Sequence, residues 1–173
     1  MKYRLTNQTL QHGGRTLYRI ECITAFGSVR AGELGGYIEH EGNLSQVGNA
    51  WVYGDARVWD NAKVYGNARV YGNAWVCGNA WVYGNALVCG NANVYGDAWV
   101  YDNARVWDNA WVYGNARVWD NAKVYGNARV WDNARVYGQA KVYDNALVYG
   151  NAQVYGSVED DKPKRLWKDT NIC

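Results

Sequence analysis

Several residue types that ordinary globular proteins use freely are nearly missing from this chain of 173 residues. It contains one Pro, one Phe and one Met, and its formal net charge at pH 7 is only +2. No apolar run approaches the length of a membrane span, and residues 1–14 show no secretory signal. These absences argue against a membrane partner and predict a location in a reducing cytoplasm.

Glycine and aromatic residues are abundant instead, with 20 Gly, 15 Tyr and 10 Trp, and they follow a repeat. From residue 48 to residue 155 the chain consists of 18 consecutive hexapeptides without insertion or deletion. The third residue is always Ala and the fifth always Val, whereas the first is Gly or Asp and the second is Asn in 15 units. The sixth is Tyr in 12 units, Trp in 4 and Cys in 2. This internal repeat is therefore the strongest basis in the sequence for predicting the fold.

A period of six residues fits a short strand and a corner, because Ala and Val at this spacing would scatter around an α-helix. Alternation along the strand places Ala and Val on one face and the fourth and sixth residues on the other. The Gly-Asn or Asp-Asn pair supplies residues that tolerate turns. Strands this short are not stable in isolation, so the units are expected to coil and to pair with the strands of the next coil.

Residues 64–69, Val-Tyr-Gly-Asn-Ala-Arg, show the pattern that carries a family likeness. The array of residues 48–155 resembles the hexapeptide repeat of left-handed parallel β-helices. That resemblance implies an all-β fold, a left-handed parallel β-helix or β-solenoid, with three hexapeptides in each triangular coil. Eighteen units at three per coil give six regular coils. At the usual strand spacing these coils form a prism roughly 29 Å long.

The expected organisation has three parts. Residues 1–35 are predicted to be an N-terminal cap, because they contain a strand-like alternation over 17–23 and an open coil edge needs covering. Residues 36–156 are predicted to form the β-helix, beginning with two degenerate repeats at 36–47. Residues 157–173 are predicted to be a C-terminal cap or tail.

The lead-in to the array carries a second likeness. Residues 34–39 (Leu-Gly-Gly-Tyr-Ile-Glu) and 43–46 (Asn-Leu-Ser-Gln), followed by Gly-Asn-Ala-Trp-Val-Tyr, resemble a group of phage, prophage and enterobacterial hexapeptide-repeat proteins. Most members of that group carry an acyltransferase label. The resemblance implies a phage or prophage origin and a place in the cytoplasm of a bacterial host.

Outward residues 18 positions apart are expected to form columns, because every third unit falls on the same face. The fourth-position columns are Trp51, Arg69, Leu87, Arg105, Lys123 and Lys141; Arg57, Trp75, Asn93, Trp111, Arg129 and Leu147; and Lys63, Trp81, Trp99, Arg117, Arg135 and Gln153. Most Tyr residues are interpreted as stacked rings that stabilise the coil. Fourth-position Trp residues, Trp51 included, enlarge an aromatic surface, which predicts a homo-oligomer, either a dimer or a trimer.

Interleaved Trp and Arg side chains also suit a small phosphorylated or nucleotide-type ligand, because rings stack on bases and guanidinium groups hold phosphates. Long nucleic acid is not expected, since the array carries nine Lys or Arg against eight Asp. The leading hypothesis is a non-enzymatic binding protein that sequesters a host defence signal, and a purely structural or protein-interaction scaffold is an alternative. The candidate ligand-binding residues are Trp81, Trp99, Trp111, Trp119, Arg105, Arg117, Arg129 and Arg135.

Acyl-CoA-dependent acyl transfer is a further alternative. The β-helix resemblance implies a catalytic His and a loop that protrudes between coils, but no insertion interrupts the array, and His12 and His40 both precede it. His40 is the one candidate general base, and a capping role is its alternative interpretation.

No cofactor and no metal site are expected. Asp102 and Asp120 fall at one corner, where paired carboxylates suit Ca²⁺, but corner Asp residues are also ordinary turn formers. The four cysteines lack ligand spacing, and Cys77 and Cys89 fall on different faces, so neither a zinc site nor a disulfide between these two is predicted.

Overall fold

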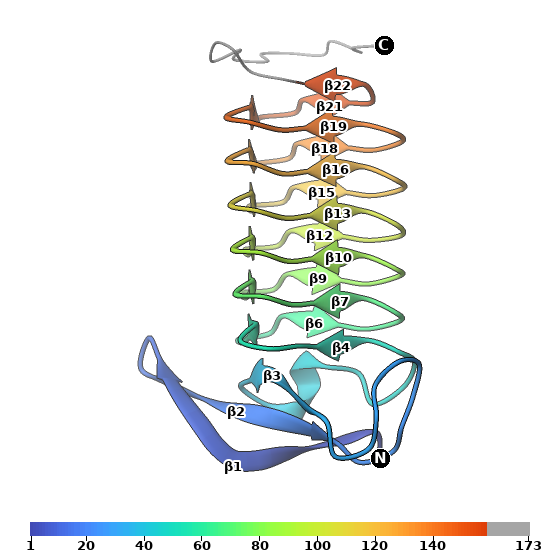
Figure 1. Cartoon of the computed structure of the whole chain (residues 1–173). Helices are drawn as coiled ribbons and strands as arrows, with labels where there is room; N and C mark the ends of the chain where they lie inside the picture. Colours follow the sequence, from blue (N-terminus) through green and yellow to red (C-terminus); the bar gives the residue numbers. More distant parts are fainter. Residues whose placement is uncertain (159–173) are drawn as a thin grey trace.

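The computed structural model describes residues 1–158, which form a three-sided parallel β-solenoid with a β-hairpin across its N-terminal end (Figure 1). Strands of successive coils pair 18 residues apart, as in Leu87 with Arg105 and Val88 with Val106. Three hexapeptides therefore complete one coil, and the predicted fold class is confirmed. The backbone carries this pairing: the Arg105 N–H donates to the Ala122 carbonyl at 2.9 Å, and the Trp107 N–H donates to the Val124 carbonyl at 3.0 Å.

Each side of the prism is one sheet, and the strands of the regular coils are two residues long. The six-stranded sheet contains β6 (Lys63–Val64), β9 (Trp81–Val82), β12 (Trp99–Val100), β15 (Arg117–Val118), β18 (Arg135–Val136) and β21 (Gln153–Val154). The seven-stranded sheet contains β4 (Trp51–Val52), β7 (Arg69–Val70), β10 (Leu87–Val88), β13 (Arg105–Val106), β16 (Lys123–Val124), β19 (Lys141–Val142) and β22 (Ser157–Val158). The nine-stranded sheet contains β1 (Tyr3–His12), β2 (Arg15–Cys22), β3 (Leu34–Ile38), β5 (Arg57–Val58), β8 (Trp75–Val76), β11 (Asn93–Val94), β14 (Trp111–Val112), β17 (Arg129–Val130) and β20 (Leu147–Val148). These three sheets reproduce the three predicted columns.

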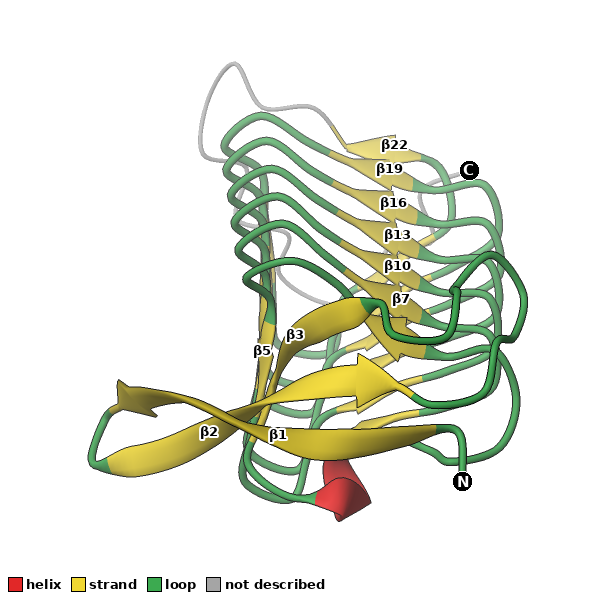
Figure 2. Cartoon of the chain, turned by 60° about the horizontal axis from the view of Figure 1, so that its bottom comes forward, coloured by secondary structure: helices red, strands yellow, loops and turns green. Residues whose placement is uncertain are grey.

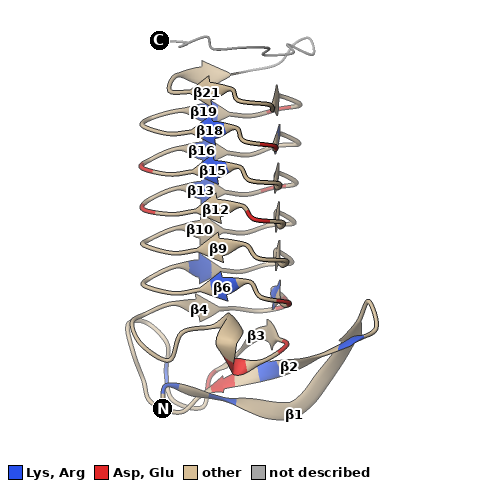
Figure 3. Ribbon diagram, turned by 180° about the vertical axis from the view of Figure 1, so that it is seen from behind, with Lys and Arg blue, Asp and Glu red and all other residues tan. Residues whose placement is uncertain are grey.

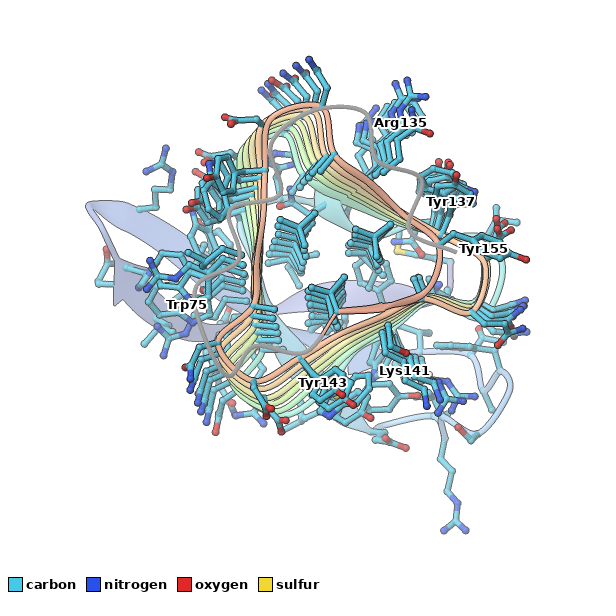
Figure 4. All side chains as sticks on the ribbon, turned by 90° about the horizontal axis from the view of Figure 1, so that it is seen from above. Trp75, Arg135, Tyr137, Lys141, Tyr143 and Tyr155 are labelled. Carbon is cyan, nitrogen blue, oxygen red and sulfur yellow. The ribbon has the colours of Figure 1, made fainter. Side chains whose placement is uncertain are left out.

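The coil is left-handed. Figure 4 looks down the solenoid from above, the end of the C-terminal coils. The labelled residues follow the chain clockwise from Arg135 and Tyr137 through Lys141 to Tyr143 as it rises toward the viewer. A path that turns clockwise while it approaches the viewer has left-handed sense.

The core of the prism consists of the repeated Ala and Val side chains, which all point inward and are buried. Two small side chains from each of three sides fill the narrow cross-section, so no large residue is needed inside the regular coils. Burying these methyl groups supplies about 0.8 kcal/mol for each CH₂ equivalent, which compensates for the shortness of the strands.

The corners take a left-handed backbone conformation at the first residue of the unit. Asp120 has a φ of 57°, and its Oδ2 accepts a hydrogen bond at 3.0 Å from the Gly138 N–H one coil further on. The neighbouring Asn residues stack into amide ladders, in which Asn49 donates to Asn67 at 3.1 Å and Asn67 donates to Asn85 at 3.0 Å. Corner side chains therefore tie consecutive coils together, in addition to the strand pairing.

The N-terminal segment closes the first coil with antiparallel strands. β1 and β2 form a hairpin, β2 pairs antiparallel with β3, and β3 pairs parallel with β5, so the hairpin continues the nine-stranded sheet (Figure 2). The first coil is irregular: Ile38 pairs with Val58 at a spacing of 20 residues, and the 3-10 helix η1 (Glu41–Asn43) lies between its strands.

One outward assignment was wrong. Trp51 occupies a fourth position, but its side chain is fully buried, because Tyr3 and Phe26 pack against it with ring centroids at 6.0 and 5.4 Å. The non-repetitive N-terminal segment covers this part of the first regular coil. Trp51 therefore belongs to the core and contributes nothing to the exposed aromatic surface.

At the other end, β22 pairs with β19, so sheet pairing continues to Val158. The rest of the expected C-terminal cap or tail, residues 159–173, lies outside the described residues. No helix within residues 1–158 is long and apolar enough to cross a lipid bilayer.

Candidate functional site

The sixth-position rings of the six-stranded sheet show what a filled column looks like. Tyr65 and Tyr83 stack with centroids 4.8 Å apart, and Tyr83 and Tyr101 stack at 4.9 Å. Trp119 continues the stack at 5.8 Å from Tyr101. The rings are nearly parallel, with interplanar angles of 3–4° in these pairs. A filled column therefore holds one ring for each coil.

The fourth-position column of the same sheet is a sandwich of two rings between two cations. Trp81 and Trp99 stack with centroids 5.4 Å apart and an interplanar angle of 9°. Lys63 Nζ lies 5.4 Å from the Trp81 ring centroid, and the Arg117 guanidinium lies 4.8 Å from that of Trp99. Both outer ring faces thus carry a cation, and both inner faces are covered by the partner ring.

The nine-stranded sheet has the same arrangement with one ring missing. The Arg57 guanidinium lies 5.6 Å from the Trp75 ring centroid, and the Arg129 guanidinium lies 5.0 Å from that of Trp111. Between the two tryptophans stands Asn93, whose strand pairs with both of theirs. Because a filled column holds one ring for each coil, the space over Asn93 has the height of one ring.

A second gap adjoins the first. In the sixth-position column of this sheet Cys77 occupies the position between Trp59 and Tyr95, and above Tyr95 the stack continues with Tyr113 at 4.9 Å. The two gaps form a hollow of about 600 Å³ on the outside of the nine-stranded sheet. Figure 4 shows Trp75, one of its walls, projecting outward from the prism. The hollow is lined by Arg57, Trp59, Asn73, Trp75, Cys77, Asn91, Asn93, Tyr95 and Trp111.

The lining of the hollow is aromatic and amide in character, and within residues 1–158 it includes one cation and no carboxylate. Burial, with a smaller contribution from the Asp60 carboxylate, raises the pKa of Cys77 to about 11. Burial is also the main cause that raises the pKa of Tyr95. Both groups are therefore neutral at pH 7, and the thiol is neither a nucleophile nor a ready metal ligand. This chemistry suits binding better than reaction.

The N-terminal hairpin supports the lower wall of the hollow. The His12 ring contacts both Trp59 and Trp75 edge to face, each with a centroid distance of 4.8 Å. Its Nδ1 accepts a hydrogen bond from Arg57 Nη1 at 3.1 Å. Burial, followed by the charges of Arg57 and Arg15, lowers the pKa of His12, so the ring is neutral and able to accept at pH 7. The hairpin thus holds the two tryptophans and the guanidinium in place.

The structure distributes the eight predicted ligand-binding residues over three faces. The six-stranded sheet carries Trp81, Trp99, Trp119, Arg117 and Arg135, the nine-stranded sheet carries Trp111 and Arg129, and the seven-stranded sheet carries Arg105. Figure 3 shows Lys and Arg following the upper strands of the solenoid, with Asp at the corners. Only Trp111 of the eight lines the hollow.

His40 has a structural place in the first coil. Its Nδ1 accepts a hydrogen bond from the Gly42 N–H at 3.1 Å, which caps η1, and its Nε2 lies 2.9 Å from the Asp60 carbonyl oxygen. With Nδ1 accepting, Nε2 carries the proton and donates to the carbonyl. Both ring nitrogens are engaged, so this geometry gives no support to His40 as a general base.

The other expected or excluded sites can be placed as well. Asp120 is one of the two Asp residues at a shared corner, and its carboxylate accepts a hydrogen bond from the Gly138 N–H. Within residues 1–158 no three His, Cys, Asp or Glu side chains gather in a way that could hold a metal ion. Cys77 and Cys89 lie next to different sheets, as predicted, and within residues 1–158 neither forms a disulfide.

Most residues of the hollow were missed by sequence reasoning, which looked for large and charged residues. The available signal was the opposite one: positions where a column of rings or cations is interrupted by a small side chain. Cys77 and Asn93 are such interruptions, and they lie on adjacent coils of one face. The support by His12 had no signal, because the hairpin lies outside the repeat.

Comparison with known families agrees with this architecture. Four segments of the solenoid, residues 62–78, 98–114, 122–138 and 140–156, are similar to the YdcK beta solenoid repeat. No curated protein sequence matches the chain. The repeat match and the stacked coils together support a protein of the β-helix repeat type.

Proposed function

We propose that this chain, a β-solenoid repeat protein, is a non-enzymatic binding protein for a small molecule that carries a flat aromatic ring. The observation that carries the proposal is the ring-sized gap over Asn93, between Trp75 and Trp111. In the six-stranded sheet the corresponding inner ring faces cover one another. Here they are separated, and a flat ring is the shape that restores the stack.

The exposed ring faces on both sides of the gap would supply the binding energy of a stacked ring. Trp75 and Trp111 are 36% and 37% exposed, which is high for tryptophan on a rigid sheet. Stacking one base on one aromatic side chain is worth about 1–3 kcal/mol, and a ring in this gap would contact two. The walls are held by strand pairing and by the hairpin, so binding costs little ordering of the protein.

Calorimetric titration with adenosine, cyclic and linear nucleotides and indole derivatives tests the proposal. We expect heat of binding with at least one ring-containing probe and quenching of tryptophan fluorescence at the same concentrations. Absence of both signals for every probe at micromolar protein would refute ring binding.

Asn93→Trp is the matched variant, because Trp occupies the same repeat position on five other units and would fill the gap itself. It should abolish binding. Leu147→Trp is its control, since it places the same side chain at the same repeat position of the same sheet, away from the hollow. Equal loss in both variants would mean that the hollow is not the binding site.

A second proposal concerns self-association as a dimer or trimer through the six-stranded sheet. Its support is the partly exposed stack of Trp81 and Trp99, which lies beside a row of tyrosine rings that Trp119 continues. Sedimentation should show concentration-dependent association that Trp81→Ala combined with Trp99→Ala weakens and that Trp107→Ala, on another sheet, leaves intact. Sedimentation that the double variant does not change would count against this interface.

The finer form of the binding proposal names the ligand as a nucleotide-type signal that a phage or prophage protein withholds from its host. Its supports are the likeness of residues 34–46 to phage and prophage proteins and the combination of rings with guanidinium groups on the solenoid. Binding of nucleotides in preference to simple indoles in the titration above would distinguish this form from general ring binding.

A further inference from the structure

Among the residues that the structure describes, Arg57 is the one cation that lines the hollow, and its hydrogen bonding is incomplete. Nη1 donates to His12, but Nε is buried and has no hydrogen-bond partner among residues 1–158. No carboxylate lies within ion-pairing distance of this guanidinium in the described part of the chain, where Arg4 and Arg15 form the ion pairs. A partly covered guanidinium without a counter-charge is costly to keep unless something else compensates it.

The groups that contact Arg57 are uncharged, so they leave its positive charge uncompensated. His12 faces it as an uncharged acceptor, and the Trp75 ring covers one side of it. At the far end of the same column Arg129 covers Trp111 in the same way, and its charge partly offsets the rise that burial causes in the pKa of Tyr95 in the hollow. Arg57 and Arg129 thus lie at the two ends of this column, and none of the residues 1–158 that line the hollow is acidic. The carboxylate that acts on Cys77, that of Asp60, is already paired with Arg15.

The two gaps of the hollow differ in what surrounds them. The gap over Asn93 has a tryptophan on each side. The gap over Cys77 lies in the neighbouring sixth-position column, one coil before Asn93, and next to Trp59, which directly follows the strand of Arg57. A ligand that fills both would thus have a flat part in the first gap and a second part near the guanidinium.

We infer that the hollow selects an anionic planar aromatic molecule, with its ring between Trp75 and Trp111 and its negative group at Arg57. This inference rests on the proposed ring binding and adds the charge of the ligand to it. The phosphate of a mononucleotide and the carboxylate of an aromatic acid share the required chemistry. Arg57 acts as the anion-binding residue, and His12 acts as a positioning residue that orients the guanidinium through Nη1.

Two matched pairs of probes separate the ring from the charge: adenosine with AMP, and indole-3-acetamide with indole-3-acetate. We expect the charged member of at least one pair to bind about tenfold or more tightly than the neutral member, because hydrogen bonds to charged groups are the stronger class. A gain with AMP alone would identify phosphate as the anion, and a gain with both pairs would identify any anion on a flat ring. Equal affinity within both pairs overturns the inference and leaves ring binding intact, whereas no binding of any probe overturns both.

Arg57→Gln should remove the advantage of the charged probe, so that this variant binds AMP no more tightly than adenosine. Arg129→Gln is the matched control, since it removes a cation stacked on the opposite wall, and it should retain most of the advantage. If Arg57→Gln preserves the full difference between AMP and adenosine, Arg57 is not the anion site.

Because Arg57 also contacts the hairpin, a measurement on the unaltered protein keeps the test independent of folding. Raising the salt concentration should weaken AMP binding and leave adenosine binding unchanged, since screening acts on the charge interaction alone. The same salt response for both probes would contradict an anion site.

Discussion

Filling an interrupted ring column should stabilise the solenoid, and Cys89→Tyr tests this on a face that does not contain the hollow. Cys89 stands between Tyr71 and Trp107 in a column that resumes with Trp107 and Tyr125 stacked at 4.4 Å. Tyr is the commonest residue at this repeat position, so the new side chain fits the local backbone.

The magnitude follows from the stacking that the new ring adds and the hydrogen bond that it removes. A ring at residue 89 would contact the rings of Tyr71 and Trp107, and each aromatic pair contributes about 0.5–1.5 kcal/mol. The change removes the hydrogen bond between Tyr71 and Cys89, worth about 1 kcal/mol at most. It also covers part of Tyr71, which is 39% exposed. The net increase in the free energy of unfolding should be about 1 kcal/mol.

Urea unfolding followed by circular dichroism measures this increase, provided that the slopes of the transitions agree. Cys89→Ala is the control, because it removes the thiol and its hydrogen bond without adding a ring, and it should be slightly less stable than the parent. If Cys89→Tyr is no more stable than Cys89→Ala, stacking along the columns contributes nothing measurable. A ligand ring that fills the gap over Asn93 would then gain no measurable stacking energy either.

Three further predictions concern the corner, the hairpin and the core. Asp120→Ala should cost about 2 kcal/mol in urea unfolding, because Ala is disfavoured at a φ of 57° and the corner hydrogen bond is lost, and Asp120→Gly should cost about half as much. The pKa of His12 is lowered from 6.5 in the folded state, so hairpin docking should be complete above about pH 6.5 and should weaken as the pH falls below it, when the imidazole takes up a proton beside Arg57. The fluorescence of the two tryptophans that this ring contacts reports the change, and His12→Gln should remove it. Ala104→Leu should destabilise by more than about 2 kcal/mol in thermal unfolding, because the prism has no room for a larger side chain, whereas Arg105→Leu, facing outward, should have little effect.

Much of the solenoid could be predicted because its repeat couples local structure directly to tertiary structure. With three units per coil, the identity of every residue 18 positions away is known, so the partners Trp75, Asn93 and Trp111 can be read from the sequence. The inward direction of Ala and Val follows from strand alternation, and the invariance of both residues marks them as core. For these residues the periodicity determines neighbours as well as conformation.

The candidate site could be predicted only in part. The rings and cations of the outer faces were expected, but Trp81 and Trp99 cover each other, whereas the gap lies on the nine-stranded sheet. Stacking depends on side-chain orientation, which composition does not specify. The gap itself had a sequence signal in Asn93, a small residue within a column of rings and cations.

The sequence by itself determined the strand-and-corner unit, the inward residues and the composition of the core, since a period of six residues allows one pattern of alternation. The coil length of three units, and with it the three columns, came from the likeness to left-handed parallel β-helices. Only the tertiary structure decided that Trp51 is buried and that His12 reaches Trp59, Trp75 and Arg57. The physical reason is that residues 1–35 carry no repeat. Their position depends on long-range contacts between unlike residues, which periodicity does not predict. Those contacts place His12 against Trp59 and Trp75, the aromatic residues that it supports.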